Sequence, residues 1–459
     1  MPTDETNAAH YDLIIIGSGS ANAIPAYLDG WKIAIVERGT FGGTCLNVGC
    51  IPSKMFVLPA DLAVQAAGSD RLGVDVRFHG ADWAAIRDRV FGRIDEIVES
   101  GRRYRASGSE HVTLIEGTAR FVRPKVIDVE GRIITADRIL IGAGSRPVVP
   151  PIPGLVETGF HTSDSIMRLD ALPARLGIIG GGYIAVEMGH VFSAFGSKVS
   201  LFNRSHVLLR TQDHEVAERF TASFATRVDV HLEHLPTRVE RRGDAIAIHC
   251  AGEVIEVDQL LVATGREPNS DLLDAESGGL ACHHHGTIAV DEHMRTTVDG
   301  VWAIGDIANE FQLKHVANHE AAVAFWNIAH PDDLRTVDHK AVPAAVFSNP
   351  QVASVGLTEQ QARDRGLDIV VGRRDYAGTA YGWALADETS FAKVIVERPS
   401  GLLVGAHIMG PQAASLIQPV VQAMQFDQTA AQLAHGPYWI HPALTEVVEN
   451  AVLDALEQL

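Results

Sequence analysis

Two glycine-rich segments, each directly after an apolar run, constrain the fold of this chain most. The first reads YDLIIIGSGSANA and contains Gly17 and Gly19, and the next apolar run ends in Glu37, 20 residues after Gly17. This order predicts a dinucleotide-binding βαβ unit, because glycines allow close backbone approach to a pyrophosphate and the acid binds a ribose hydroxyl pair. Asn22 and Pro25 depart from the usual pattern, so we expect a short or distorted first helix.

The second glycine segment reads LGIIGGGYIAVEMGH and is followed by a second apolar run, KVSLF. It contains Gly180 and Gly182, and the position expected to be acidic is Asn203, with Arg204 and Arg210 nearby. Loss of the carboxylate and gain of guanidinium groups favours a 2′-phosphate, so this unit is predicted to prefer NADPH. The alternative is that both arginines are solvated loop charges.

The chain has four cysteines: Cys45, Cys50, Cys250 and Cys282. The first two lie five positions apart in GGTCLNVGCIPSK and could form a structural disulfide, half of a metal site or a redox couple. Metal sites need more clustered ligands, and structural disulfides are rare in a reducing cytosol, which leaves the redox couple or two unbonded thiols. Three adjacent histidines, His283–His285, are interpreted as exposed and structural, and no metal site is predicted.

The spacing of Cys45 and Cys50 also predicts an irregular backbone. On one regular helix their Cα atoms would lie ~7.5 Å apart along the axis, beyond the ~7 Å that a disulfide tolerates. Gly49 supplies backbone freedom beside Cys50. A strained, accessible disulfide is easily reduced, which suits a catalytic bond.

Composition excludes several classes of function. The 459 residues carry a formal net charge of −19, which argues against a nucleic-acid or anionic-membrane partner. No apolar run approaches the ~20 residues that span a bilayer, and the start MPTDETNAAH lacks the features of a secretory signal. We therefore expect a cytoplasmic protein without a membrane partner.

Four segments together resemble the pyridine nucleotide-disulfide oxidoreductases, the glutathione reductase-like family. They are GGTCLNVGCIPSK, LLVATGREPN, TTVDGVWAIGDI and HPALTE, and they occur in the family's order over essentially the whole chain. The resemblance implies an α/β fold with two Rossmann-like dinucleotide-binding domains, for FAD and NADPH, and a C-terminal α+β dimerisation domain. The implied ranges are 1–145 (FAD domain, first part), 146–269 (NADPH domain), 270–336 (rest of the FAD domain) and 337–459 (interface domain).

The resemblance also implies which residues bind the cofactors. Those assigned to FAD are Gly17, Gly19, Glu37, Thr44, Asp306 and His315, the last in the helix that begins LKHVANHEAA. Those assigned to NADPH are Gly180, Gly182, Tyr183, Arg204, Arg210 and Gly265. Tyr183 would cover the flavin until nicotinamide displaces it, although core packing is the plainer interpretation of this residue. Lys54 and Glu187 are similar to the family's ion pair beside the flavin.

The catalytic roles follow from the same resemblance. Cys50 would face the flavin, and Cys45 would attack the substrate disulfide. His441 would exchange protons with Cys45, and Glu446 would hold its imidazole, with His441 supplied by the other subunit of a homodimer. A helix start with Pro442 in its first turn explains the HPALTE motif equally well, and both interpretations can hold together.

Differences within the family indicate the substrate. Asn203 argues against lipoamide dehydrogenase, and the ending AVLDALEQL lacks the extra cysteines of mercuric and thioredoxin reductases. NAIPAYLDGW contains no lysine or arginine, which weakens the case for glutathione. Asn22 in the first loop together with the segments LKHVANHEA, YGWALAD and YWIHPALTEVVENA most resembles the members that reduce mycothione, a low-molecular-weight disulfide of a cysteinyl pseudo-disaccharide. Glutathione reductase, dihydrolipoamide dehydrogenase and a diaphorase that does not reduce disulfides remain alternatives.

Overall fold

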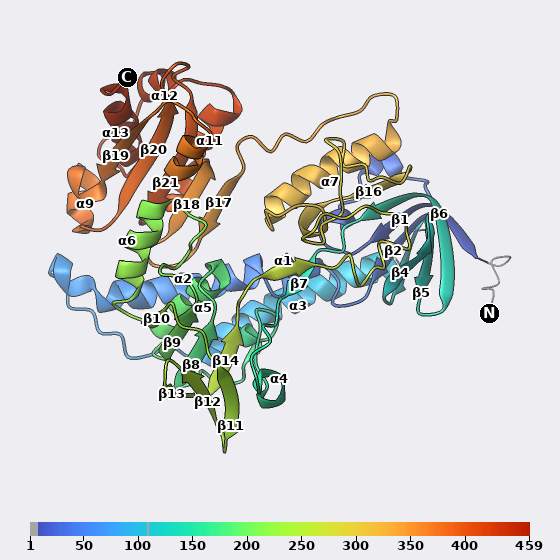
Figure 1. Ribbon diagram of the computed structural model, residues 1–459, viewed down its shortest axis with the longest axis horizontal. Helices are drawn as coiled ribbons and strands as arrows, with labels where there is room; N and C mark the ends of the chain where they lie inside the picture. The colour runs from blue at the N-terminus through green and yellow to red at the C-terminus, as the bar shows by residue number, and fades with distance from the viewer. Residues whose placement is uncertain (1–7, 108–109) are drawn as a thin grey trace. The chain divides into compact units, whose positions relative to one another are not determined.

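The computed structural model describes residues 8–107 and 110–459. The chain folds into two compact units, and Figure 1 colours it by residue number. The first unit comprises the described residues of 1–52, 87–148 and 265–338, and the second comprises 53–86, 149–264 and 339–459. The boundaries between the two units at residues 52/53 and 86/87 fall within two long helices, α2 (Cys50–Ala67) and α3 (Trp83–Ser107).

A seven-stranded sheet forms the centre of the first unit, in the order β3-β2-β1-β6-β5-β4 with β16 beside β6. Its strands are β1 (Ala9–Ile16), β2 (Ile33–Glu37), β3 (Val112–Glu116), β4 (Ala119–Arg123), β5 (Val126–Val129), β6 (Arg132–Ile141) and β16 (Val301–Ala303). Strands β3, β2, β1, β6 and β16 are parallel. Leu13 and Ile15 of β1 enter one core and Ile14 and Ile16 another, which explains its unbroken apolar run.

In the first unit, the segment between the first glycine loop and β2 contains 3₁₀ turns in place of an α-helix. The other elements of this unit are η2 (Ser20–Asn22), η3 (Ala26–Leu28), α1 (Gly43–Asn47), β7 (Ser145–Pro147), β15 (Arg266–Pro268), η6 (Gly305–Ile307) and α7 (Lys314–Ala329). The predicted distortion is confirmed, because two 3₁₀ turns separated at Pro25 replace the first helix. Arg105 of α3 stabilises the first turn by donating to the side-chain and backbone oxygens of Asn22, both at 2.9 Å.

The second unit contains a parallel sheet in the order β10-β9-β8-β14. Its strands are β8 (Arg175–Ile179), β9 (Lys198–Asn203), β10 (Asp229–Leu232) and β14 (Gln259–Val262), and an antiparallel sheet adds β11 (Arg238–Arg242), β12 (Ala245–Cys250) and β13 (Glu253–Val257). The helical elements of this part are η4 (Ser69–Leu72), α4 (Leu155–Thr158), η5 (Ile166–Arg168), α5 (Tyr183–Ala194) and α6 (His214–Phe224). Gly177 of β8 lies against Ile248 of β12, so the two sheets share a core.

The C-terminal part of the second unit is an antiparallel sheet in the order β17-β18-β21-β20-β19, packed with helices. Its strands are β17 (Pro343–Val346), β18 (Val352–Gly356), β19 (Ile369–Asp375), β20 (Phe391–Glu397) and β21 (Leu403–Met409). Its helical elements are α8 (Glu359–Asp364), η7 (Tyr376–Gly378), α9 (Ala380–Leu385), α10 (Ala413–Leu416), α11 (Gln418–Gln425), α12 (Ala430–His435) and α13 (Thr445–Leu456). Helix α13 lies so close to β19 that a Cβ on Gly372 would be 2.0 Å from the Ala451 carbonyl oxygen.

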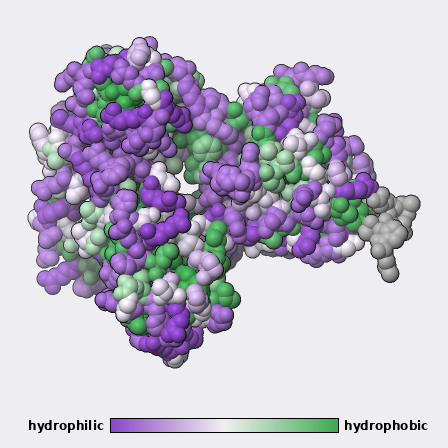
Figure 2. Space-filling view, viewed as in Figure 1, coloured by the Kyte–Doolittle hydropathy of each residue, from purple (hydrophilic) through white to green (hydrophobic). Residues whose placement is uncertain are grey.

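The architecture confirms the predicted α/β fold. In each of two sheets a glycine loop follows an inner strand of the parallel part, and a C-terminal α+β part follows. Figure 2 shows hydrophilic residues over most of the visible face, with small hydrophobic patches between them. Among the helices of the described residues, none is both long and apolar enough to cross a membrane.

Candidate active site

The first glycine loop packs directly on neighbouring backbone. Gly17 has a φ of 98°, and a Cβ there would lie 2.4 Å from the carbonyl oxygen of Gly142. A Cβ on Gly43 would lie 2.7 Å from the Cα of Gly19. Thr44 is exposed in the first turn of α1. Glycines at these close approaches fit a loop whose backbone N–H groups can approach the pyrophosphate of a dinucleotide cofactor.

Ser18 fixes the carboxylate of Glu37 at the end of β2. The Ser18 N–H and hydroxyl donate to Glu37 Oε2 at 2.9 and 2.6 Å, and the Gly39 N–H donates to Oε1 at 2.8 Å. The Ser18 hydroxyl oxygen accepts in turn from the Gly42 N–H at 2.8 Å. Ser18 escaped the sequence prediction because its partners lie 19 and 24 residues away along the chain.

Asp306 is held by residues from two other parts of the first unit. Ser145 donates its hydroxyl to Asp306 Oδ2 at 2.6 Å, and Arg266 Nε donates to Ser145 Oγ at 2.8 Å. The preceding Gly305 has a φ of 71°. The predicted cofactor residue Asp306 therefore has a fixed orientation on η6, and Ser145 is a contributor that no sequence motif indicated.

Helix α7 begins without a side-chain cap. Leu313 stands at the N-cap, the first turn has no acidic residue, and His315 is exposed there. The Lys314 ammonium donates a hydrogen bond to Ser20 Oγ at 3.0 Å, which connects α7 to the first glycine loop. An uncapped N-terminus carries partial positive charge, so this end of α7 fits an electron-rich group.

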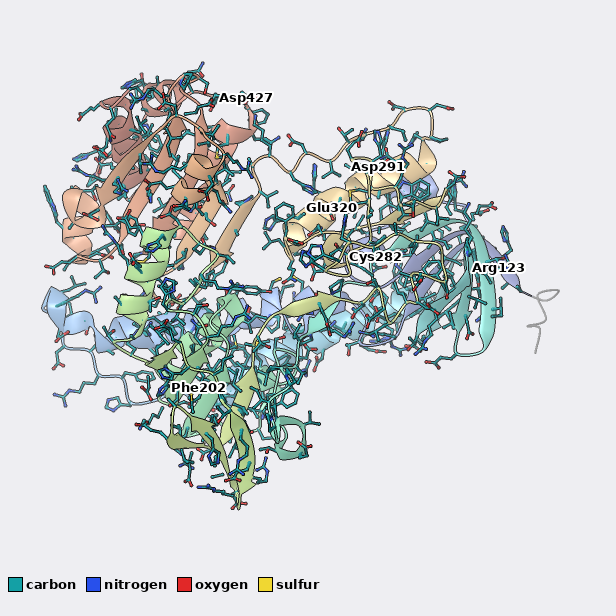
Figure 3. All side chains as sticks on the ribbon, viewed as in Figure 1. Arg123, Phe202, Cys282, Asp291, Glu320 and Asp427 are labelled. Carbon is teal, nitrogen blue, oxygen red and sulfur yellow. The ribbon has the colours of Figure 1, made fainter. Side chains whose placement is uncertain are left out.

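Glu320 is a fully buried carboxyl on α7, labelled in Figure 3. It accepts from the Gly305 N–H at 2.7 Å and from the Asn309 amide at 2.9 Å. Burial raises the pKa of Glu320 to about 7, whereas these two hydrogen bonds lower it and the charge of Asp306 raises it further. Like Ser145, Glu320 holds the η6 turn in place by a hydrogen bond.

The raised pKa of Glu320 predicts that the stability of the folded protein depends on pH. Between the ordinary glutamate pKa of 4.5 and the folded value of about 7, the folded state holds a proton that the unfolded state releases. The free energy of unfolding should therefore fall as pH rises through this window, by at most about 3 kcal/mol. Urea unfolding at pH 5 and pH 8 measures this fall, which Glu320→Gln should remove and Glu292→Gln, at an exposed site, should preserve. An unchanged fall in Glu320→Gln would contradict the assignment.

Cys45 and Cys50 lie on different helices, as the predicted irregular backbone requires. Helix α1 ends after Asn47, and α2 begins at Cys50. A Cβ on Gly49 would lie 2.9 Å from the Thr44 carbonyl oxygen and 3.2 Å from the Cys45 Cα. Gly49 thus allows close approach of the two cysteine segments.

The two thiols of this pair are electrostatically unequal. Cys45 is half-buried and Cys50 is exposed. The hydrogen bond between them, followed by burial and the charge of Cys50, raises the pKa of Cys45 well above its usual range, while Lys314 lowers it. The thiol of Cys45 is therefore hard to ionise in the reduced pair.

The second glycine loop repeats the close packing of the first. Gly180 has a φ of 130°, and a Cβ there would lie 2.1 Å from the Ala263 carbonyl oxygen. Gly182 is the N-cap of α5, with open space at its Cβ position, and Tyr183 is 41% exposed in the first turn. Gly265, the remaining glycine assigned to the nucleotide, also has a φ of 130° and lies in the first unit.

The end of β9 has a buried amide and two exposed guanidinium groups. The Asn203 amide donates to the backbone oxygens of Ser205 and Val207 at 3.1 and 2.7 Å and so shapes the loop. Arg204 and Arg210 are exposed, and within the described chain neither forms a hydrogen bond or ion pair. Both remain available to a phosphate.

Lys54 and Glu187 form the predicted ion pair. The Lys54 ammonium donates to both carboxylate oxygens, at 2.9 and 2.8 Å, and links α2 to α5. The Glu187 side chain is 4% exposed and that of Lys54 is 34% exposed. The Phe347 N–H, which the sequence did not suggest, also donates to Glu187, at 2.9 Å.

His441 and Glu446 also form the predicted contact. Glu446 Oε1 accepts from His441 Nδ1 at 2.7 Å, and its other oxygen accepts from the Ala443 N–H at 3.3 Å. Glu446 lies in the first turn of α13, where a carboxylate is favoured. Donation from Nδ1 leaves Nε2 of the exposed imidazole free to accept a proton.

The other cysteines and the histidine run have ordinary surroundings. Cys250 is buried in β12, and burial raises its pKa. Cys282 is exposed as a residue, but partial burial of its sulfur raises its pKa. His285 lies 3.5 Å from Glu310. Residues 8–107 and 110–459 contain no group of three or more His, Cys, Asp or Glu side chains placed to hold a metal ion.

Comparison with known families gives two matches that cover most of the chain. Residues 11–321 match "Pyridine nucleotide-disulphide oxidoreductase", and residues 342–452 match the dimerisation domain of the same family. The HOCl-induced flavoprotein disulfide reductase RclA from Escherichia coli has a similar solved structure, with a TM-score of 0.85 at 28% identity. That similarity covers 98% of this chain and 100% of the other.

Curated relatives cover nearly the same length. A mycothione reductase from Mycobacterium tuberculosis is 47% identical over 96% of this chain and 99% of its own. A mercuric reductase from Staphylococcus aureus is 36% identical over 93% and 80%, and a glutathione reductase from Burkholderia cepacia is 33% identical over 95% and 97%.

These matches confirm the predicted family and the cofactors that it uses, FAD and a nicotinamide nucleotide. They agree with two glycine loops, a cysteine pair and a histidine–carboxylate contact in one chain. This chain belongs to the pyridine nucleotide-disulphide oxidoreductase family and is a flavoprotein disulfide oxidoreductase.

Proposed function

We propose that this enzyme uses NADPH to reduce mycothione to mycothiol through FAD and the Cys45–Cys50 disulfide. The observation that carries the proposal is the 47% identity to a mycothione reductase over nearly the full length of both chains. The glutathione reductase that covers the chain equally well is 33% identical. A dihydrolipoyl dehydrogenase from Geobacillus stearothermophilus is also 33% identical.

The first unit has the residues to hold FAD. Gly17, Gly19 and Glu37 would bind the adenosine half, Thr44 its pyrophosphate and Asp306 the ribitol or pyrophosphate, with His315 in the first turn of α7. FAD supplies the passage of two electrons from nicotinamide to a disulfide. The proposed domains remain 1–145 and 270–336 for FAD, 146–269 for NADPH and 337–459 for the subunit interface.

The cysteine pair divides its chemistry according to its electrostatics. His441 takes the proton from Cys45, whose thiolate attacks one substrate sulfur and releases the first thiol. The product is a mixed disulfide between Cys45 and half of the substrate. The first leaving sulfur receives the proton from His441. Cys50, as a thiolate, then attacks Cys45 Sγ, restores the Cys45–Cys50 bond and releases the second product as a thiolate, which takes its proton from solvent.

Glu446 fixes the orientation of His441 for this proton exchange. The hydrogen bond to Nδ1 leaves Nε2 as the atom that accepts and returns the proton. The match to a dimerisation domain and the exposure of the imidazole support a homodimer in which His441 serves the partner's cysteine pair. We assign the enzyme to the cytoplasm, where low-molecular-weight disulfides require continual reduction.

Arg204 and Arg210 should select NADPH over NADH. Replacing both by alanine removes two charge-assisted contacts to the 2′-phosphate, so kcat/KM for NADPH should fall about 100-fold while that for NADH changes little. Steady-state kinetics with both nucleotides measures the ratio. Lys198→Ala, at the opposite end of β9, is the control and should retain the preference. Equal use of the two nucleotides by the unaltered enzyme would refute the assignment.

Turnover with NADPH and the disulfides of mycothiol, glutathione and lipoamide tests the substrate. We expect the highest kcat/KM for mycothione. Preference for glutathione disulfide would refute the substrate and leave the family intact. NADPH oxidation by dyes without turnover of any disulfide would instead support the diaphorase alternative.

A further inference from the structure

The segment Phe347–Asn349, between β17 and β18, holds the Lys54–Glu187 pair from a third side. The Phe347 N–H donates to Glu187 Oε1 at 2.9 Å. The Phe347 ring lies against the lysine ammonium, with 4.8 Å between Lys54 Nζ and the ring centroid. One residue thus contacts both members of the pair, through its backbone and through its ring.

The ring has a defined physical effect on the lysine. Glu187 is almost completely buried and accepts from both Lys54 and Phe347, so its carboxylate has little freedom. The Lys54 side chain is 34% exposed and flexible, and water competes for its ammonium. The negative face of an aromatic ring attracts an ammonium within about 6 Å and so favours the position on Glu187.

The segment that carries Phe347 is itself anchored at Asn349. Arg227 donates to the backbone carbonyl of Asn349. The same guanidinium lies 3.3 Å from His190 Nδ1, and the other ring nitrogen of His190 lies 2.9 Å from Asp61 of α2. The segment is therefore fastened to the same two helices, α2 and α5, that carry the ion pair.

We propose that Phe347 is a positioning residue that holds the Lys54 ammonium on the Glu187 carboxylate and thereby sets how fast NADPH reduces the enzyme. The inference rests on the proposed placement of Lys54 beside the flavin. Because the contact to Glu187 is made by the backbone N–H, a side-chain variant of Phe347 removes only the contact between the ring and Lys54.

Stepwise fluorination of the Phe347 ring tests this role in the holoenzyme. Each added fluorine weakens the attraction of the ring for a cation and largely preserves its shape. Stopped-flow rate constants for reduction by NADPH should fall in order of fluorine number. Phe347→Leu should lower the rate between about threefold and thirtyfold, and Phe347→Trp should retain it.

A second readout follows Lys54 itself. Its rate of modification by an amine-reactive reagent, relative to that of exposed Lys198, should rise in the same order as fluorination. The matched control is Phe391, whose ring lies 4.2 Å from the Arg219 guanidinium in the same unit. The same fluorination at Phe391 should change neither readout.

Rates that do not vary across the Phe347 series would overturn the inference. Lys54→Met separates this failure from a failure of the proposed site. If Lys54→Met slows reduction while the Phe347 series has no effect, only the role of Phe347 is wrong. If Lys54→Met leaves reduction by NADPH unchanged, the assignment of Lys54 to the flavin site is wrong, and the inference fails with it.

Discussion

Replacing Cys45 by serine should lower disulfide turnover by at least about 10³-fold while NADPH still reduces a dye acceptor. A serine oxygen cannot form the mixed disulfide, whereas nicotinamide binding does not involve Cys45. Parallel assays with mycothione and with a dye acceptor, both using NADPH, measure the two activities. Loss of dye reduction to the same extent would indicate general damage to the enzyme.

Cys50→Ser should stop the reaction one step later. Cys45 can still attack the substrate, but no neighbouring thiolate resolves the product. The reduced variant should release one thiol per subunit and retain half of the substrate on Cys45, which mass spectrometry of the intact protein detects. Cys282→Ser, at another exposed cysteine, is the control and should turn over normally. Sustained turnover by Cys50→Ser would refute the division of roles.

Replacing His441 by glutamine should lower disulfide turnover by between about 10² and 10⁴-fold. The pKa of Cys45 is raised, so without a base little of the attacking thiolate forms at neutral pH. Turnover of the variant should therefore rise with pH beyond the optimum of the unaltered enzyme, because hydroxide replaces part of the lost base. Measured pH profiles of kcat/KM for the disulfide check this shift.

Two further variants test how Glu446 supports His441 and whether the effect is specific to this histidine. Glu446→Gln retains an acceptor for Nδ1 but removes the charge, so we expect a smaller loss, about tenfold. His435→Gln, at the exposed end of α12, is the control and should keep normal turnover. A His441→Gln enzyme with an unaltered pH profile would show that another group takes the proton from Cys45.

Local sequence patterns predicted the structure correctly where the conformation of a segment depends on its own residues. The apolar run of β1 predicted the first strand of a dinucleotide-binding unit, and Asn22 with Pro25 predicted a short or distorted first helix. The spacing of Cys45 and Cys50 predicted an irregular backbone, which the structure shows as a break between α1 and α2. Each expectation depends on periodicity, on proline or on helical rise, which act within a few residues.

Residues that act through distant partners could not be predicted in this way. Ser18 and Glu320 each complete a contact 15 to 24 residues away, and Phe347 meets Glu187 across 160 residues. Ser18 lies in the first glycine loop, whereas Glu320 and Phe347 belong to neither a glycine loop nor the cysteine motif. The compact units also group residues 53–86 with 149–264 and 339–459, an association that linear order does not reveal.

Differential alkylation of the holoenzyme tests the relay most directly. Thiols are labelled under anaerobic conditions before and after addition of NADPH, and each cysteine is identified by peptide mass spectrometry. We predict that Cys45 and Cys50 become labelled only after NADPH is added, while the labelling of Cys250 and Cys282 is unchanged. Labelling of Cys45 and Cys50 that does not depend on NADPH would contradict electron transfer through their disulfide.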